Sequence, residues 1–148
     1  MWRTFTSILT SVFLATAGVA DERPQGLQWN RSGLAATLPL QVKTDAGADY
    51  LLRLRDVETG QFVLAAYIRG GEFFRVLVPP GLYKLLFAFG ANWQGEKALF
   101  GPDTQYSMID QPLRFGATVS RKHGHLIDLR AEAEILVRNF AFCQRLSP

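Results

Sequence analysis

Hydrophobic and polar residues alternate in short runs along most of the chain. Tyr50, Leu52 and Leu54 fall on one face of such a run, and the arginines between them fall on the other. This period of two is typical of a half-buried β-strand. Gly, Pro and Asp residues separate the runs at intervals of about ten residues, a spacing that favours sandwiches and barrels. The pattern predicts a mainly β fold, a single antiparallel β-sandwich over residues 34–148.

One predicted strand carries the densest group of large apolar side chains in the chain. Four of them share one face, and burying each stabilises the fold by about 1.5–3 kcal/mol. We therefore expect this strand to lie at the centre of the core. The four residues are Tyr83, Leu85, Phe87 and Phe89.

Three local signals refine the expected strand arrangement. Pro39 lacks a backbone N–H and predicts an edge position for the strand around it. The run 62–69 is apolar on both faces, as expected of a central strand. Gly70 and Gly71 follow it and fit a two-residue hairpin turn, since both positions tolerate positive φ.

The first twenty residues have the features of a secretory signal. Arg3 gives a positive start, an apolar run covers residues 8–19, and the small residues Gly18 and Ala20 occupy the −3 and −1 positions. We predict cleavage after Ala20 and a periplasmic or secreted product. The alternative is an uncleaved signal that anchors the chain in a membrane, the one route by which we expect membrane contact.

The two ends of the mature chain are less regular than its middle. Residues 21–33 are polar and aperiodic, so we expect a loose arm that Trp29 pins down. Residues 131–146 fit both a helical stripe and a strand. Their β-branched and aromatic content favours the strand.

Charge and cysteine content narrow the possible partners. The net charge of +3 falls to +2 when Arg3 is removed with the signal, and basic and acidic residues alternate instead of forming a basic block. The sequence therefore lacks the basic cluster that is typical of nucleic-acid-binding proteins. Cys143 is the single cysteine, so no intramolecular disulfide can form. We expect a buried thiol there, with an intermolecular bridge or reactive thiol as the alternative.

Several short motifs carry a resemblance to known modules. The run Val78 to Leu85 resembles the proline-glycine-tyrosine turn of transthyretin-like and carboxypeptidase-regulatory-like β-sandwich modules. The larger block 49–115 resembles an uncharacterised family of bacterial exported or membrane-tethered small domains. That resemblance implies a β-sandwich and export, and it implies no activity. The block joins Tyr50-Leu51-Leu52-Arg53-Leu54, Gly70-Gly71, Pro80-Gly81-Leu82-Tyr83, Trp93-Gln94-Gly95, Leu99-Phe100-Gly101-Pro102-Asp103-Thr104 and Tyr106-Ser107.

The segment from Trp93 to Ser107 mixes aromatic and small polar residues and is the candidate interaction loop. One interpretation is a recognition rim, since aromatic residues among small polar ones are typical of binding surfaces. The other is a loop that folds back on its own aromatics and plugs one end of the sandwich, which we favour. The candidate residues are Trp93, Gly95, Glu96, Phe100, Asp103, Thr104 and Tyr106.

Groups that could carry chemistry are sparse. Glu96 and Asp103 would be the acid–base pair of a hydrolase, although a turn role for Asp103 and an exposed position for Glu96 are the simpler interpretation. His123 and His125 would point the same way in an extended chain and could both reach a metal. The simpler interpretation is two histidines in a solvated turn. Motifs for nucleophiles and phosphate loops are missing from the sequence. We predict no catalytic residue, no cofactor and no metal.

The resulting functional hypothesis is an exported, non-enzymatic β-sandwich module. It would bind a protein partner or a component of the cell envelope, through the candidate interaction loop or an edge strand. The alternative is a small periplasmic hydrolase, or a carbohydrate-binding or carbohydrate-acting domain, that uses the same loop.

Overall fold

The computed structural model describes residues 23–118, 121–130 and 136–143. Over these residues the chain forms ten β-strands and one short 3-10 turn, η1, with no α-helix. The predicted signal over residues 1–20 and its cleavage site fall outside them. The elements are β1 (Gly26–Asn30), β2 (Leu38–Lys43), β3 (Asp49–Asp56), β4 (Phe62–Ile68), β5 (Phe74–Val78), β6 (Gly81–Gly90), η1 (Gly101–Asp103), β7 (Gln105–Met108), β8 (Leu113–Ala117), β9 (Arg121–Asp128) and β10 (Leu136–Cys143).

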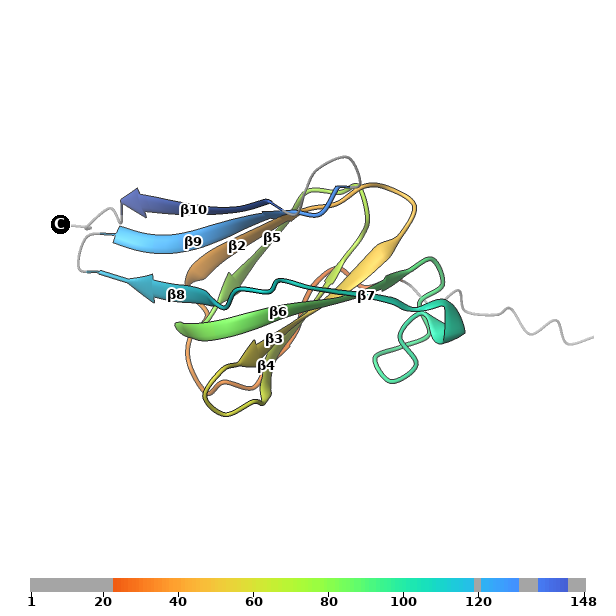
Figure 1. Cartoon of the computed structure of the whole chain (residues 1–148), viewed down its shortest axis with the longest axis horizontal. Helices are drawn as coiled ribbons and strands as arrows, with labels where there is room; N and C mark the ends of the chain where they lie inside the picture. The colour runs from red at the N-terminus through yellow and green to blue at the C-terminus, as the bar shows by residue number, and fades with distance from the viewer. Residues whose placement is uncertain (1–22, 119–120, 131–135, 144–148) are drawn as a thin grey trace, which may run out of the picture.

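The strands form a hydrogen-bonded path in the order β1-β4-β3-β6-β8-β9-β2-β5, with β7 added beside β6 and β10 beside β9 (Figure 1). β8 links the two parts of the path, because it pairs with β6 through Leu113–Phe115 and with β9 through Gly116 and Ala117. The end strands β1 and β5 are in contact, so the sheet nearly closes on itself like a barrel. The mainly β prediction is confirmed. Nothing helical in the described part of the chain is long and apolar enough to cross a membrane.

The interior of the fold has the predicted centre. Tyr83, Leu85 and Phe87 of β6 are buried, and Phe89 packs against them partly exposed. β6 pairs with β3 on one side and with β7 and β8 on the other, so its inward face meets neighbours in both directions. The period-two interpretation of this strand is confirmed.

The prediction that Pro39 marks an edge strand is wrong. β2 lies between β5, with which it is antiparallel, and β9, with which it is parallel. The expectation of a purely antiparallel fold therefore fails at this pair as well. The parallel ladder starts at Leu40, and β9 passes Pro39 at Gly124, where a Cβ atom would overlap the proline carbonyl oxygen. A proline is tolerated in this interior strand because the parallel ladder begins after it and needs no N–H from it, and because Gly124 leaves room for its ring.

Gly70 and Gly71 do not form the predicted hairpin. β4 pairs with β1 and β3, whereas β5 pairs with β2, so the two glycines carry the chain from one ladder to another. Their turn packs against residues 44–49, where a Cβ on Gly70 would overlap the carbonyl oxygen of Ala48. Close backbone approach, and not hairpin geometry, is what these glycines provide.

A buried carboxylate stabilises this connection between the two ladders. Asp49 accepts hydrogen bonds from the Tyr67 hydroxyl at 2.8 Å and from the Gly70 N–H at 3.0 Å. Arg23 Nη1 lies 3.2 Å from the same carboxylate. Burial, and then the hydrogen bond to Asp49, raises the pKa of the Tyr67 hydroxyl, which therefore keeps its proton and donates it.

Part of the segment predicted to be a loose arm is a strand. Within residues 21–33, β1 pairs antiparallel with β4 and supplies partners for the backbone of that strand. Trp29 does pin the segment, since its indole N–H donates to Glu96 at 2.8 Å. The expectation of a loose arm is therefore wrong for Gly26–Asn30.

The predicted strand in the tail is confirmed. β10 pairs antiparallel with β9 from Leu136 to Cys143. Residues 131–135 and 144–146 of that prediction lie outside the described residues, as does the side chain of Cys143, so both interpretations of the thiol stay predictions.

Candidate functional site

A second apolar cluster lies on the outer face of strands β3, β4 and β6. Leu51 points away from the interior because it alternates with the core residues Tyr50 and Leu52, and yet it is buried. The segment that follows β6 covers it. The cluster consists of Leu51, Ala65, Tyr67, Ala88, Leu99 and Phe100, with Trp29 and Trp93 packed at its margin.

The candidate interaction loop folds back onto this outer face. The Trp93 ring meets Tyr67 edge-on at 4.8 Å between centroids and lies 5.2 Å from Phe100. Backbone hydrogen bonds of 2.7 Å link Gln94 to Leu99 and Leu99 to Gly95. The favoured interpretation of a loop held by its own aromatics is thus confirmed, except that the loop covers the outer face of the sheet and not an end of a sandwich.

Most of the predicted site residues hold the loop together. Trp93 and Phe100 belong to the outer cluster. The Thr104 hydroxyl accepts from the Phe100 N–H at 3.0 Å and donates to the Gly101 carbonyl at 2.7 Å. Gly95 takes a positive φ of 95° within the loop.

The other three predicted residues, Glu96, Asp103 and Tyr106, lie outside the outer cluster. Glu96 accepts a hydrogen bond from Trp29, and Asp103 lies exposed in the 3-10 turn η1. Tyr106 is on β7 and is 71% exposed. The structure therefore packs Trp93 and Phe100 against the sheet and leaves Tyr106 as the exposed aromatic residue among the predicted ones.

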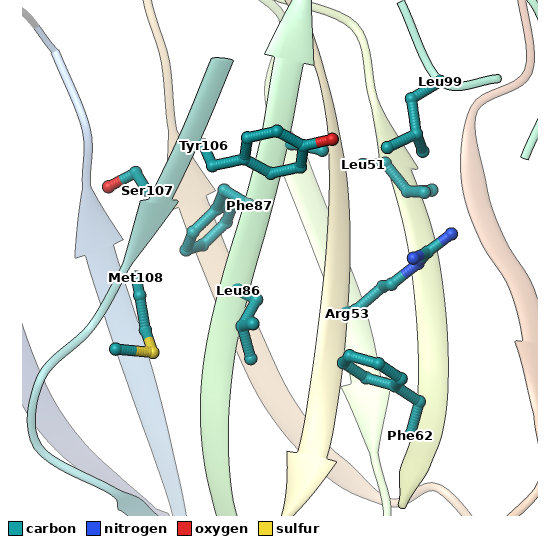
Figure 2. A pocket seen from close by; sticks show the side chains of 10 residues that line it. Leu51, Arg53, Phe62, Leu86, Phe87, Leu99, Tyr106, Ser107 and Met108 are labelled. Atoms are coloured by element: carbon teal, nitrogen blue, oxygen red, sulfur yellow. The ribbon is translucent and has the colours of Figure 1, made fainter. Parts of the chain in front are cut away.

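Tyr106 forms one wall of an apolar groove of about 310 Å³ on the outer face of the sheet. Figure 2 shows Tyr106 and Met108 on one side of Leu86, with Arg53 and Phe62 on the other side. Leu51 and Leu99 line the same groove near the outer cluster. The candidate functional site is this groove.

The register of β6 and β7 explains why the groove exists. Leu86 pairs with Met108, and Ala88 pairs with Tyr106, so the apolar residues of both strands point to the same outer face. β7 has four residues, and its large side chains have no second strand beside them among the described residues. Met108 is 44% exposed as a result. A ridge of apolar side chains therefore stands beside a floor of smaller ones.

Arg53 separates the groove from a basic hollow. Its Nη2 donates to the Glu96 carbonyl at 3.1 Å and lies 3.8 Å from the Glu96 carboxylate. The guanidinium carbon also lies 5.7 Å from the Phe62 ring centroid. Arg31 and Lys97 line the hollow together with Arg53 and Glu96, so its rim has three cations and one carboxylate.

Sequence reasoning missed Arg53, Phe62, Leu86 and Met108 as site residues. Arg53 has the pattern of an ordinary solvent-facing residue, because it alternates with Leu52 and Leu54 in its strand. The available signal was apolar residues on the nominally polar face, above all Leu86 between Leu85 and Phe87. A strand that is apolar on both faces needs a cover on each, and here one cover is incomplete.

The two candidate carboxylates do not form a pair. Glu96 lines the basic hollow and is engaged by Trp29 and Arg53. Asp103 is not among the residues that line that hollow. A glycosidase mechanism requires two carboxyl groups that flank one bond, and the described residues do not offer this arrangement.

The two histidines lie on β9 and not in a solvated turn. His125 is 5% exposed, its Nε2 is 2.8 Å from the Arg114 carbonyl oxygen, and its ring stands edge-on to Phe115 at 4.6 Å. It thereby bridges β9 to β8 where the two strands separate. His123 and His125 both line a second surface hollow, together with Arg114 and Asn139. Across the described ranges, no group of three His, Cys, Asp or Glu side chains is placed to hold a metal ion.

No family model, curated protein or solved structure matches this chain.

Proposed function

We propose that this protein is an exported, non-enzymatic module of the β-sandwich type that binds a component of the cell envelope or a protein partner. Binding takes place in the groove between Tyr106 and Arg53. The resemblance to bacterial exported small domains and the signal-like first twenty residues support export.

The observation that carries this proposal is the exposed apolar ridge of β7. Tyr106 and Met108 are exposed beside a concave apolar surface, and such surfaces are typical of binding sites in soluble proteins. The groove is lined on its far side by Phe62 and on its floor by Leu86. Its volume of about 310 Å³ lies at the lower end of the range for small-ligand sites.

The rival function, a small periplasmic hydrolase or a carbohydrate-acting domain, has less support. Acid–base catalysis needs a positioned pair of groups in a cleft, and the groove is lined by no carboxylate. Glu96 is held by Trp29 and Arg53, while Asp103 lies apart from it in a turn.

The test compares two substitutions that add the same charge at equal exposure. Met108 lies in the groove and Leu77 lies on β5, and each is 44% exposed. Met108→Glu places a carboxylate where an apolar group would bind, and desolvating that charge is costly. Native mass spectrometry and proteomics of the protein purified from its producing cells measure what co-purifies. We expect Met108→Glu to reduce the bound component at least about tenfold.

Leu77→Glu is the matched control and should retain the wild-type component. Both variants should keep the wild-type unfolding midpoint, because exposed substitutions usually change stability by less than about 0.5 kcal/mol. An identical set of co-purified components in Met108→Glu and Leu77→Glu would contradict the proposal.

A further inference from the structure

We infer that the occupant of the groove is a single-chain anionic amphiphile, an alkyl chain with a carboxylate head group. This inference rests on the proposed function and names the class of ligand for that site. The alkyl chain lies between Tyr106 and Phe62, and the head group lies at Arg53, on the border of the basic hollow.

The lining of the groove favours an alkyl chain over a polypeptide. Its side-chain polar groups are the Arg53 guanidinium and the hydroxyls of Tyr106 and Ser107. Each residue of an extended peptide brings one N–H and one C=O, and burying these groups unpaired costs about 1–3 kcal/mol apiece. A methylene chain carries no such groups and gains from burial alone.

The position of the groove supports the same conclusion. A peptide that adds to a sheet edge obtains its affinity from main-chain hydrogen bonds. The groove lies over the face of the sheet, above Leu86 of β6, and the backbone of β6 is already paired with β3 and β7 there. An occupant of the groove therefore meets side chains and not a free strand edge.

The charge beside the groove favours an anionic head group. Arg53 lines both the groove and the hollow, where Arg31 and Lys97 outnumber the single carboxylate of Glu96. Among the described residues, Nη2 is the one Arg53 nitrogen with a hydrogen-bond partner, so the Nη1 donors are not engaged. A carboxylate can satisfy a guanidinium with two parallel hydrogen bonds. The alkyl chain of the amphiphile thus lies on the apolar lining, and its carboxylate lies beside a cation.

The experiment titrates the purified full-length protein with decanoate and with decyltrimethylammonium, two monomeric probes with the same chain and opposite charge. The fluorescence of Trp29 and Trp93 reports binding, since both rings border the outer cluster that contains Leu99. We expect decanoate to bind at least about tenfold more tightly than the cation, because a hydrogen bond to a charged group contributes about this much. Shortening the chain from decanoate to octanoate should weaken binding up to about fourfold per methylene.

Two variants locate the two halves of the ligand. Met108→Glu should abolish binding of decanoate, whereas Arg53→Gln should remove the preference for decanoate over the cation. Because Arg53 contacts Glu96, Lys97→Gln serves as a second head-group variant with no effect on the groove. It should weaken decanoate binding and spare the cationic probe.

Several results would overturn the inference. Equal binding of both probes, with decanoate binding lost in Met108→Glu, would leave the groove as a binding site and refute the anionic head group. No binding of either probe, or decanoate binding that Met108→Glu leaves unchanged, would refute the amphiphile. Binding to anionic vesicles in the absence of monomer binding, or a polypeptide as the co-purified component, would also refute it. The proposed function would then stand or fall on the co-purification comparison alone.

Discussion

Replacing Phe87 with alanine should lower the free energy of unfolding by about 3–5 kcal/mol, the usual cost of removing a large buried aromatic side chain. Phe87 is 1% exposed and lies on the central strand β6 between β3 and β7. Strands on both sides hold the surrounding backbone, so the cavity cannot close easily. Equilibrium unfolding in urea measures the change.

Phe73→Ala is the matched control for this prediction. Phe73 is 79% exposed in the turn that precedes β5, so the same chemical change should alter stability by less than about 0.5 kcal/mol. Similar losses of stability in the two variants would contradict the placement of β6 at the centre of the core.

Replacing Asp49 with alanine should destabilise the protein by about 3 kcal/mol. Its carboxylate accepts hydrogen bonds from the Tyr67 hydroxyl and the Gly70 N–H. Each buried donor left without an acceptor costs about 1–3 kcal/mol. The ion pair with Arg23 adds little, because that side chain is largely exposed. Thermal unfolding, combined with hydrogen exchange at the Gly70 amide, measures both the global and the local effect.

Asp110→Ala provides the comparison, since Asp110 is exposed and should tolerate the change. We expect faster exchange at Gly70 in Asp49→Ala and unchanged exchange in Asp110→Ala. If Gly70 exchanged at the wild-type rate without Asp49, the carboxylate would not be what fastens the crossing between the two ladders.

Local periodicity was enough to predict most of the strands and the centre of the core, but it missed β1 and β7. The side chains of Tyr83, Leu85 and Phe87 alternate with less buried residues, and burial of one face fixes such a strand in place. The tail strand followed from β-branched and aromatic content alone. These features depend on a few neighbouring residues, which is why the sequence reveals them.

Long-range pairing could not be predicted in the same way. Pro39 is tolerated in an interior strand because the ladder to β9 begins only at Leu40 and because Gly124, far away in the sequence, leaves room for its ring. Gly70 and Gly71 cross between ladders because they pack against residues 44–49. Local sequence patterns identify a turn or a strand, but they do not specify which strand it pairs with.

The candidate site was predicted in part. Tyr106 was among the predicted site residues and lines the groove. Trp93 and Phe100 were also predicted, but they pack against the outer face of the sheet and help to cover it. Aromatic residues in a long segment have the same appearance in sequence whether they bind a partner or hold the segment down. Arg53 and Met108 were missed because their role comes from strands β3 and β7 standing on either side of β6.

The most direct test of the binding groove is photo-crosslinking with a decanoate analogue that carries a diazirine near the end of its chain. Peptide mapping by mass spectrometry locates the label on the full-length protein. The proposed binding mode predicts labels on β6 and β7 around Leu86 and Met108, with competition by unlabelled decanoate. Labels on β2, β5 or β9, or labelling of β7 that decanoate does not compete, would contradict it.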